Sequence, residues 1–118
     1  RFDATGAPRG SEFLVPTYTA DNQSQPSVAM DALGNFVIAW TGPAHDGNPG
    51  EVFVQRYNAN GLALGGEIRV ETYTTNNQTS PVVAMDSAGN FLVTWNSQGQ
   101  DGSGYGIFGQ KFSAVGDQ

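Results

Sequence analysis

The 118-residue sequence contains no cysteine, and this absence excludes several kinds of chemistry together. Disulfide bonds, zinc–thiolate sites and thiol nucleophiles all require that residue. Histidine is almost absent too, because His45 is the only one and has no counterpart elsewhere in the chain. A Ser-His-Asp triad therefore lacks its parts. The acidic residues leave a carboxylate pair open, but most of them stand in expected turns, so we expect a non-enzymatic protein.

Basic residues are scarce as well. Lysine and arginine total five against eleven acidic residues, which gives a net charge of −6 and a pI near 4.3. Without a basic patch to neutralise phosphates, nucleic acid and anionic membranes are poor partners, and cations are favoured instead. No apolar run reaches the length of a membrane span. Low lysine with abundant Asn, Gln, Ser, Thr and Gly is typical of an exported protein, so we expect an extracellular or cell-surface location.

No stretch carries the apolar period of a helix, and a pattern that repeats after 55 residues takes its place. The sequence "QPSVAMDALGNFVIAW" at 25–40 aligns with "SPVVAMDSAGNFLVTW" at 80–95, and residues 1–19 align with 56–74 without a gap. Such a period is typical of repeat architectures, in which each unit needs neighbours to bury its faces. Two units are few for an array of this kind, so the chain is expected to have partners.

Each unit is expected to contain four short antiparallel strands. The strands expected in the first unit, separated by turns rich in Asp, Asn and Gly, are 26–30, 35–40, 51–57 and 66–74. The strand at 35–40 is apolar on both faces, which indicates a central strand packed on both sides. Trp40 and Trp95 are therefore predicted to be core residues and not sugar platforms. The predicted fold is all-β, with two four-stranded units like propeller blades.

The register puts one strand out of order. Residues 1–15 match the end of a third strand and a fourth strand, residues 16–70 form repeat 1, and residues 71–118 form repeat 2, which lacks a fourth strand. An unfilled sheet edge invites pairing with a free strand, from the same chain or from a neighbour. Because two blades cannot close a ring on themselves, we expect donation to a neighbouring chain, in a ring or a filament. The donated side chains are expected to be Phe13, Leu14 and Val15.

The stretch "SQGQDGSGYGIFGQKF" at 97–112 places glycine at five of sixteen positions. A phosphate-binding loop needs a following helix or a Walker-type lysine, and neither context is present. Two interpretations stay open: a hairpin loop with an Asp-Gly turn, or a site for a hard cation such as Ca²⁺ with side-chain oxygens at alternate positions. The candidate ligands in the two copies of this loop are Asp46, Asn48, Asp101 and Ser103.

Three further residues have assignable roles. Asp31 and Asp86 recur in a D-x-x-G-N pattern that turn chemistry explains. Tyr105 has no counterpart, because Gly50 fills the matching position. An aromatic ring in a polar loop can stack on a sugar or pack on a neighbouring chain, so Tyr105 is the candidate ligand or interface residue.

The strings "P-x-VAMD-x-x-GNF-x-x-x-W", "GQDGSGYGIFGQKF" and "G-x-x-x-GGE-x-x-V-x-TYTT-x-NQ" resemble the tandem repeats of about fifty residues in large secreted bacterial proteins, including adhesin-like and calcium-dependent surface proteins. The resemblance covers the whole chain. It implies blade-like sheets, a non-catalytic role in adhesion, display or assembly, and bound Ca²⁺. The chain also looks like a subunit of a calcium-stabilised extracellular filament. The first copy of the loop departs from the pattern at Pro43, His45, Pro49 and Glu51, so a site there is altered or absent.

These observations predict an extracellular assembly subunit, joined head-to-tail by strand donation and stabilised by Ca²⁺ in acidic loops. The alternative is a carbohydrate-binding lectin, a closed oligomeric propeller with Tyr105 or a tryptophan as the sugar platform. A third interpretation is that the chain is a two-unit slice of a longer repetitive protein. In that case the order of the strands reflects where the chain was cut.

Overall fold

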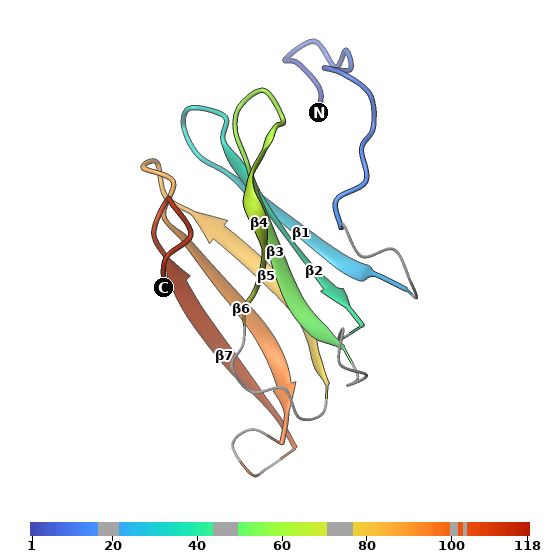
Figure 1. The fold of residues 1–118 in the computed structure, drawn as a ribbon, viewed down its shortest axis with the longest axis vertical. Coiled ribbons are helices and arrows are strands. Elements are labelled where there is room, and N and C mark those ends of the chain that lie inside the picture. The colour runs from blue at the N-terminus through green and yellow to red at the C-terminus, as the bar shows by residue number, and fades with distance from the viewer. Residues whose placement is uncertain (17–21, 44–49, 71–76, 100–101, 103) are drawn as a thin grey trace.

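The structure, a computed structural model, describes residues 1–16, 22–43, 50–70, 77–99, 102 and 104–118. These residues contain seven strands in two antiparallel sheets and no helix, which confirms the all-β prediction (Figure 1). The four-stranded sheet has the order β1(Ser24–Met30), β2(Phe36–Gly42), β3(Glu51–Tyr57) and β4(Ala63–Arg69). The three-stranded sheet has the order β5(Gln78–Met85), β6(Phe91–Gln98) and β7(Tyr105–Phe112). Within the described ranges, no helix has the length and hydropathy needed to cross a membrane.

The expected strands of the first unit agree with β1, β2 and β3, but the expected start of the fourth strand was wrong. Strand β4 begins at Ala63 instead of residue 66, because the turn before it closes early: the Asn58 amide donates to the Leu62 carbonyl at 2.9 Å, and Tyr57 pairs with Ala63 directly afterwards. The end of the expected strand, at 71–74, lies outside the described residues.

The two sheets share one pairing pattern, displaced by 55 positions. Strand β1 pairs with β2 as β5 pairs with β6, and both ladders have an irregularity, after Ser24 in one and after Thr79 in the other. Gln25 and Ser80 adopt a φ of 55° at these two places. Because a positive φ is uncommon outside glycine, its occurrence at matching positions shows that the two strands carry the same bulge.

One form of turn occurs at five places among the described residues, including 31–34 and 86–89, and three of the five are spaced by the same interval, namely 3–6, 58–61 and 113–116. In each of these three, the amide of the last residue, a glycine, donates to the carbonyl of the first residue at 2.9–3.0 Å. The three glycines have φ between 83° and 88°, a conformation in which glycine has no steric penalty. The described segment 1–7 therefore has the backbone form of the connection between β3 and β4.

The main core lies between the two sheets. It consists of Val37, Ala39, Val52, Val54 and Val70 from the first half of the chain and Val83, Phe91, Val93, Trp95 and Phe112 from the second. Strand β2 is also covered on its other side, where Phe36 stacks on Tyr57 and Trp40 packs on Phe53. Both tryptophans are buried, so the prediction that Trp40 and Trp95 are core residues is confirmed.

Residues 1–16 run beside the four-stranded sheet, on the side away from the three-stranded sheet (Figure 1). They contain no strand, only an isolated bridge between Phe2 and Pro8. The Phe13 ring lies 5.4 Å from the Tyr57 ring, centroid to centroid. Arg1 lies 5.8 Å from the centroid of the Phe36 ring and donates to the Ala59 carbonyl. This segment thus covers part of the outer face of the four-stranded sheet.

Candidate functional site

The four candidate metal ligands, Asp46, Asn48, Asp101 and Ser103, lie outside the described residues. The glycine-rich loop itself is described in part. Gln98 pairs with Tyr105 across β6 and β7, and the Gly99 amide donates to the Gly104 carbonyl at 2.6 Å. The loop therefore reverses the chain as a hairpin connection, while the calcium interpretation stays a prediction. Within the described ranges no group of three or more His, Cys, Asp or Glu side chains could hold a metal ion.

Asp31 and Asp86 close the turns that precede β2 and β6. The Asp31 carboxylate accepts hydrogen bonds from the Leu33 and Asn35 amides at 2.8 and 3.0 Å, and from Asn35 Nδ2 at 2.9 Å. Asp86 makes the same three contacts in its own turn. The Asn35 side chain contributes most to lowering the pKa of Asp31, and Asn90 does so for Asp86. The prediction that turn chemistry explains these two residues is confirmed.

Three of the four predicted interface residues are exposed, Val15 is partly buried, and the four are not brought together in one chain. The expectation that Tyr105 lies in a loop was wrong, because it pairs with Gln98 as the first residue of β7; its side chain is exposed. Phe13 and Leu14 are also exposed, and Val15 lies near the side of Trp40 that faces away from the three-stranded sheet. Because both tryptophans are buried, Tyr105 is the platform that remains for the lectin interpretation.

The two sheets differ at their last strands. Strand β3 pairs with β2 on one side and β4 on the other. Strand β7 matches β3 in sequence and pairs with β6, but no other described residue pairs with it. Residues 8–14 match β4 in the same way, and they are described without any ladder of strand pairs. Among the described residues, the chain thus has a strand edge without a second neighbour, and a segment that aligns in sequence with the strand filling the matching edge.

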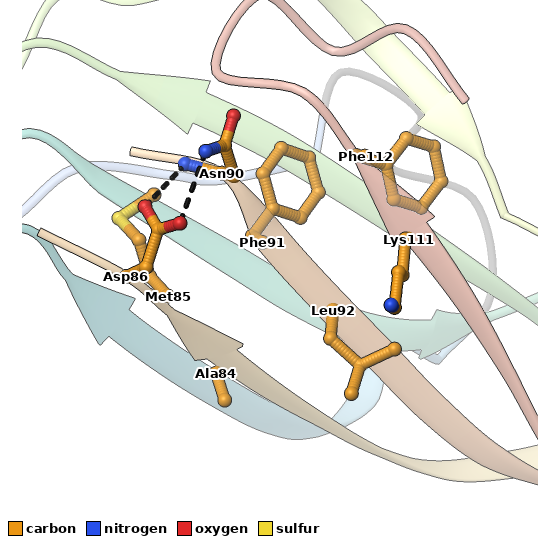
Figure 2. Close-up of a pocket in the computed structure, with 8 residues that line it drawn as sticks. All are labelled: Ala84, Met85, Asp86, Asn90, Phe91, Leu92, Lys111 and Phe112. Atoms are coloured by element: carbon orange, nitrogen blue, oxygen red, sulfur yellow. Dashed lines mark hydrogen bonds between the residues drawn. The ribbon is translucent and has the colours of Figure 1, made fainter. Parts of the chain in front are cut away.

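A hollow of about 370 Å³ opens at one end of the three-stranded sheet (Figure 2). Its lining residues are Ala84, Met85, Asp86, Asn90, Phe91, Leu92, Lys111 and Phe112. Figure 2 shows the Asp86 carboxylate turned toward Asn90 on one side and the rings of Phe91 and Phe112 on the other. The two rings are stacked with their centroids 4.8 Å apart. The lining of the hollow therefore combines apolar side chains with one carboxylate, Asp86, and one ammonium, Lys111.

The matching hollow of the four-stranded sheet measures about 140 Å³ and is partly covered by other parts of the chain. Leu64 of β4 lines it, together with Met85, Ala88 and Ala114 from the second half. Sequence reasoning did not identify either hollow. The signal was available in the repeat, since every lining residue of the larger hollow has a counterpart 55 positions earlier that also lines the smaller one, except Ala29 and Met30.

The resemblance drawn from the sequence strings stays a prediction, because comparison with known proteins adds nothing to it. No family model, curated protein or solved structure matches the chain.

Proposed function

We propose that this chain is a non-enzymatic, extracellular assembly subunit whose copies join head-to-tail, in a filament or a ring, by strand donation. Residues 8–14 of one copy would form the fourth strand of the β5-β6-β7 sheet in another copy. One observation carries the proposal. Strand β3 has a neighbour on each side, whereas β7 has β6 alone among the residues that the structure describes.

The repeat specifies the register of the donated strand. In the four-stranded sheet, Val54 pairs with Ile68. The counterpart of Val54 in β7 is Gly109, and the counterpart of Ile68 in the free segment is Phe13. Gly109 and Phe13 of different copies are therefore expected to lie directly opposite each other. The Phe13 side chain would point to the face of its new sheet that corresponds to the face of Ile68. In the four-stranded sheet, Ile68 packs against the main core.

Backbone pairing favours this contact but is not sufficient for tight association. Each hydrogen bond contributes roughly 0.5–1.5 kcal/mol, so about six ladder bonds give roughly 3–9 kcal/mol. Association itself costs roughly 4–15 kcal/mol in lost translational and rotational freedom. The two estimates overlap, so a donated strand alone predicts weak association. A stable assembly therefore needs a second contact between copies.

Calcium is the second part of the proposal. Copies that each carry a net charge of −6 repel one another. A divalent cation bound near the contact between two copies, called the junction below, would offset that repulsion. The residues proposed to hold the ion are Asp46, Asn48, Asp101 and Ser103. Their support is the chemistry of these side chains, which place oxygen atoms at alternate positions of two glycine-bearing stretches of sequence.

Cysteine cross-linking tests strand donation directly, since the chain has no native cysteine. One preparation carries Phe13→Cys and another carries Gly109→Cys, and the two are mixed and oxidised. A Cβ at Gly109 meets its nearest neighbour, Thr94 Cγ2, at 3.4 Å, so the residue fits. We expect a covalent dimer on a non-reducing gel, because opposed residues of antiparallel strands lie within disulfide range.

The matched control is a single chain with Val54→Cys and Ile68→Cys, which are paired within the four-stranded sheet. It should oxidise internally under the same conditions. If the control oxidises and the mixed preparations give no dimer, strand donation is wrong. Electron microscopy of the unmodified protein then separates the assembly forms, because discrete rings and long fibres are distinguishable in negative stain.

A further inference from the structure

The two sheets of one chain stack with different faces. The four-stranded sheet contributes Val37 and Val52 to the space between the sheets, and the three-stranded sheet contributes Phe91. By the repeat, Val37 matches Leu92, and Phe91 matches Phe36. The face that the first sheet buries is therefore not the face that the second sheet buries. The sheets stack front to back, so each end of the stack presents the half of this interface that the other end lacks.

The exposed fractions of side chains at matching positions agree with this front-to-back arrangement. Ile107, on the outer face of the three-stranded sheet, is 80% exposed, whereas its counterpart Val52 is fully buried at 0%. Leu92 is 38% exposed, against 0% for Val37. At the other end of the stack, Val28 on β1 is 62% exposed, whereas its counterpart Val83 is 6% exposed. Each outer face thus displays apolar side chains at positions that the internal interface buries.

We propose that these two outer faces are the two halves of a contact between copies of this chain. The three-stranded sheet of one copy would stack on the outer face of the four-stranded sheet of the next, as the two sheets stack within a chain. This inference rests on the proposed function and adds to it a second surface and its occupant. The contact is heterologous, so it closes into a ring if the rotation between copies permits, and otherwise grows as a filament with one face free at each end.

Stacking of one copy on the next would also fill the larger hollow, which Figure 2 shows. In the smaller hollow, Met85 and Ala88 of the second half close the space above the Asp31 turn. Their counterparts are Met30 and Leu33, and both side chains are exposed. Stacking would bring Met30 and Leu33 of the next copy over the larger hollow, beside Phe91 and Phe112 (Figure 2). Two exposed apolar residues and an open apolar hollow would be buried in one step.

The junction would differ from the internal interface at two places. Within the chain, Ser27 Oγ accepts a hydrogen bond from the Val83 amide at 3.2 Å. At the junction the same positions are Val82 and Val28, so an apolar contact replaces this bond. Tyr105 stands where the chain elsewhere has Gly50, and a Cβ at Gly50 would lie 3.3 Å from the Gln78 carbonyl oxygen of the other sheet. The ring of Tyr105 would therefore lie at the margin of the junction, as an interface residue.

Cross-linking tests the stacking contact separately from strand donation. A preparation with Val82→Cys is mixed with one carrying Val28→Cys and oxidised. The internal control is one chain with Ser27→Cys and Val83→Cys, the counterpart pair that is in contact within the structure. We expect covalent dimers from the mixture and internal oxidation of the control. A mixture that gives no dimer while the control oxidises would overturn the stacking proposal.

The pair at positions 13 and 109 makes the two failures distinguishable. If positions 13 and 109 cross-link but 82 and 28 do not, copies donate strands without stacking, and this inference alone is wrong. If 82 and 28 cross-link but 13 and 109 do not, the sheets stack and strand donation is wrong. If neither mixture gives dimers and both internal controls oxidise, both proposals are overturned.

A second measurement avoids cysteine altogether. Ile107→Arg places a charge on the proposed junction at a position that is exposed in the single chain, so the chain should still fold. We expect at least a tenfold rise in the concentration needed for half-maximal association in analytical ultracentrifugation. Val115→Arg is the matched control, since Val115 is an exposed apolar residue in the turn after β7, whose neighbour Gly116 packs on Arg56 and Ile68 within the chain. Equal association of the two variants would contradict the proposal.

Discussion

Arg56 Nη1 donates a hydrogen bond to the Ala114 carbonyl at 2.9 Å, and Arg1 makes the matching bond to the Ala59 carbonyl. Arg1, Arg56 and Lys111 are counterparts in the repeat. In the stacked arrangement that we propose, Lys111 of one copy would therefore take the place that Arg1 of the next copy occupies. Residues 1–7 repeat the form of the C-terminal turn, so the two segments compete for one position and one of them must move.

This competition predicts that removal of residues 1–7 promotes association. The segment is held by the Arg1 hydrogen bond and by the contact of Arg1 with Phe36, which together stabilise it by roughly 1–3 kcal/mol. Its removal should lower the concentration for half-maximal association by about tenfold, since 1.4 kcal/mol is a factor of ten. Sedimentation velocity on the truncated and full chains measures this.

The matched control is a chain without residues 1–15, which lacks the donated strand as well. Its association should be weaker than that of the full chain. Circular dichroism spectra of both truncated proteins should retain the β signal, because β1 to β7 lie outside the deleted segment. If the shorter deletion weakens association as much as the longer one, residues 1–7 do not block the junction.

The aspartate turns predict an acid-labile fold. The pKa values of Asp31 and Asp86 lie below the ordinary value of 3.8, chiefly because Asn35 and Asn90 donate to the two carboxylates. A lowered folded-state pKa stabilises the fold above the unfolded pKa, and this stabilisation is lost as the pH falls through the folded pKa. The melting temperature should therefore be nearly constant from pH 6 to pH 5 and should decrease below about pH 4.

The control for the acid prediction is the double variant Asp31→Asn and Asp86→Asn. It should melt at a lower temperature than the unmodified chain at pH 6, because it has no charge for the donors to stabilise. The two melting temperatures should converge as the pH falls below the lowered pKa values. A constant difference down to pH 2 would show that these carboxylates are not the source of the acid sensitivity.

Gly116 should tolerate a side chain poorly. Its φ is 88°, and an added Cβ would lie 3.0 Å from Arg56 Nε and 3.1 Å from Ile68 Cδ1. Gly116→Ala should lower the free energy of unfolding by about 1–3 kcal/mol, through backbone strain and crowding. Gly66→Ala is the control: Gly66 has no positive φ and nothing within 4 Å of its Cβ position. Urea denaturation should show it as neutral or slightly stabilising, and an equal loss in both variants would refute the argument.

The sequence predicts local structure well here because the repeated stretches have nearly the same residues, and equal residues form equal turns and strands. It placed β1, β2 and β3 and explained Asp31 and Asp86. It did not predict which face of a strand meets another sheet. Leu92 and Val37 are similar residues at matching positions, yet one is 38% exposed and the other fully buried. That difference comes from the neighbouring sheet, which no local pattern encodes. The size of the larger hollow, beside Phe112, likewise depends on which sheet lies next to it, so the local sequence did not predict it.

Calcium dependence can be separated from ordinary screening. Salt weakens repulsion between copies of charge −6, so sodium chloride alone should promote association to a modest extent. A bound ion should act at far lower concentration and with saturation, because it contacts specific oxygens. Millimolar calcium, compared with sodium chloride at equal ionic strength, should therefore lower the concentration for half-maximal association, and a chelator should reverse the effect. The variant Asp101→Asn should weaken the calcium response, the double variant Asp46→Asn and Asp101→Asn should remove it, and both should leave the sodium response unchanged. If calcium acts no more strongly than the matched salt, the loops do not bind the ion, and the junction depends on strand pairing and sheet stacking alone.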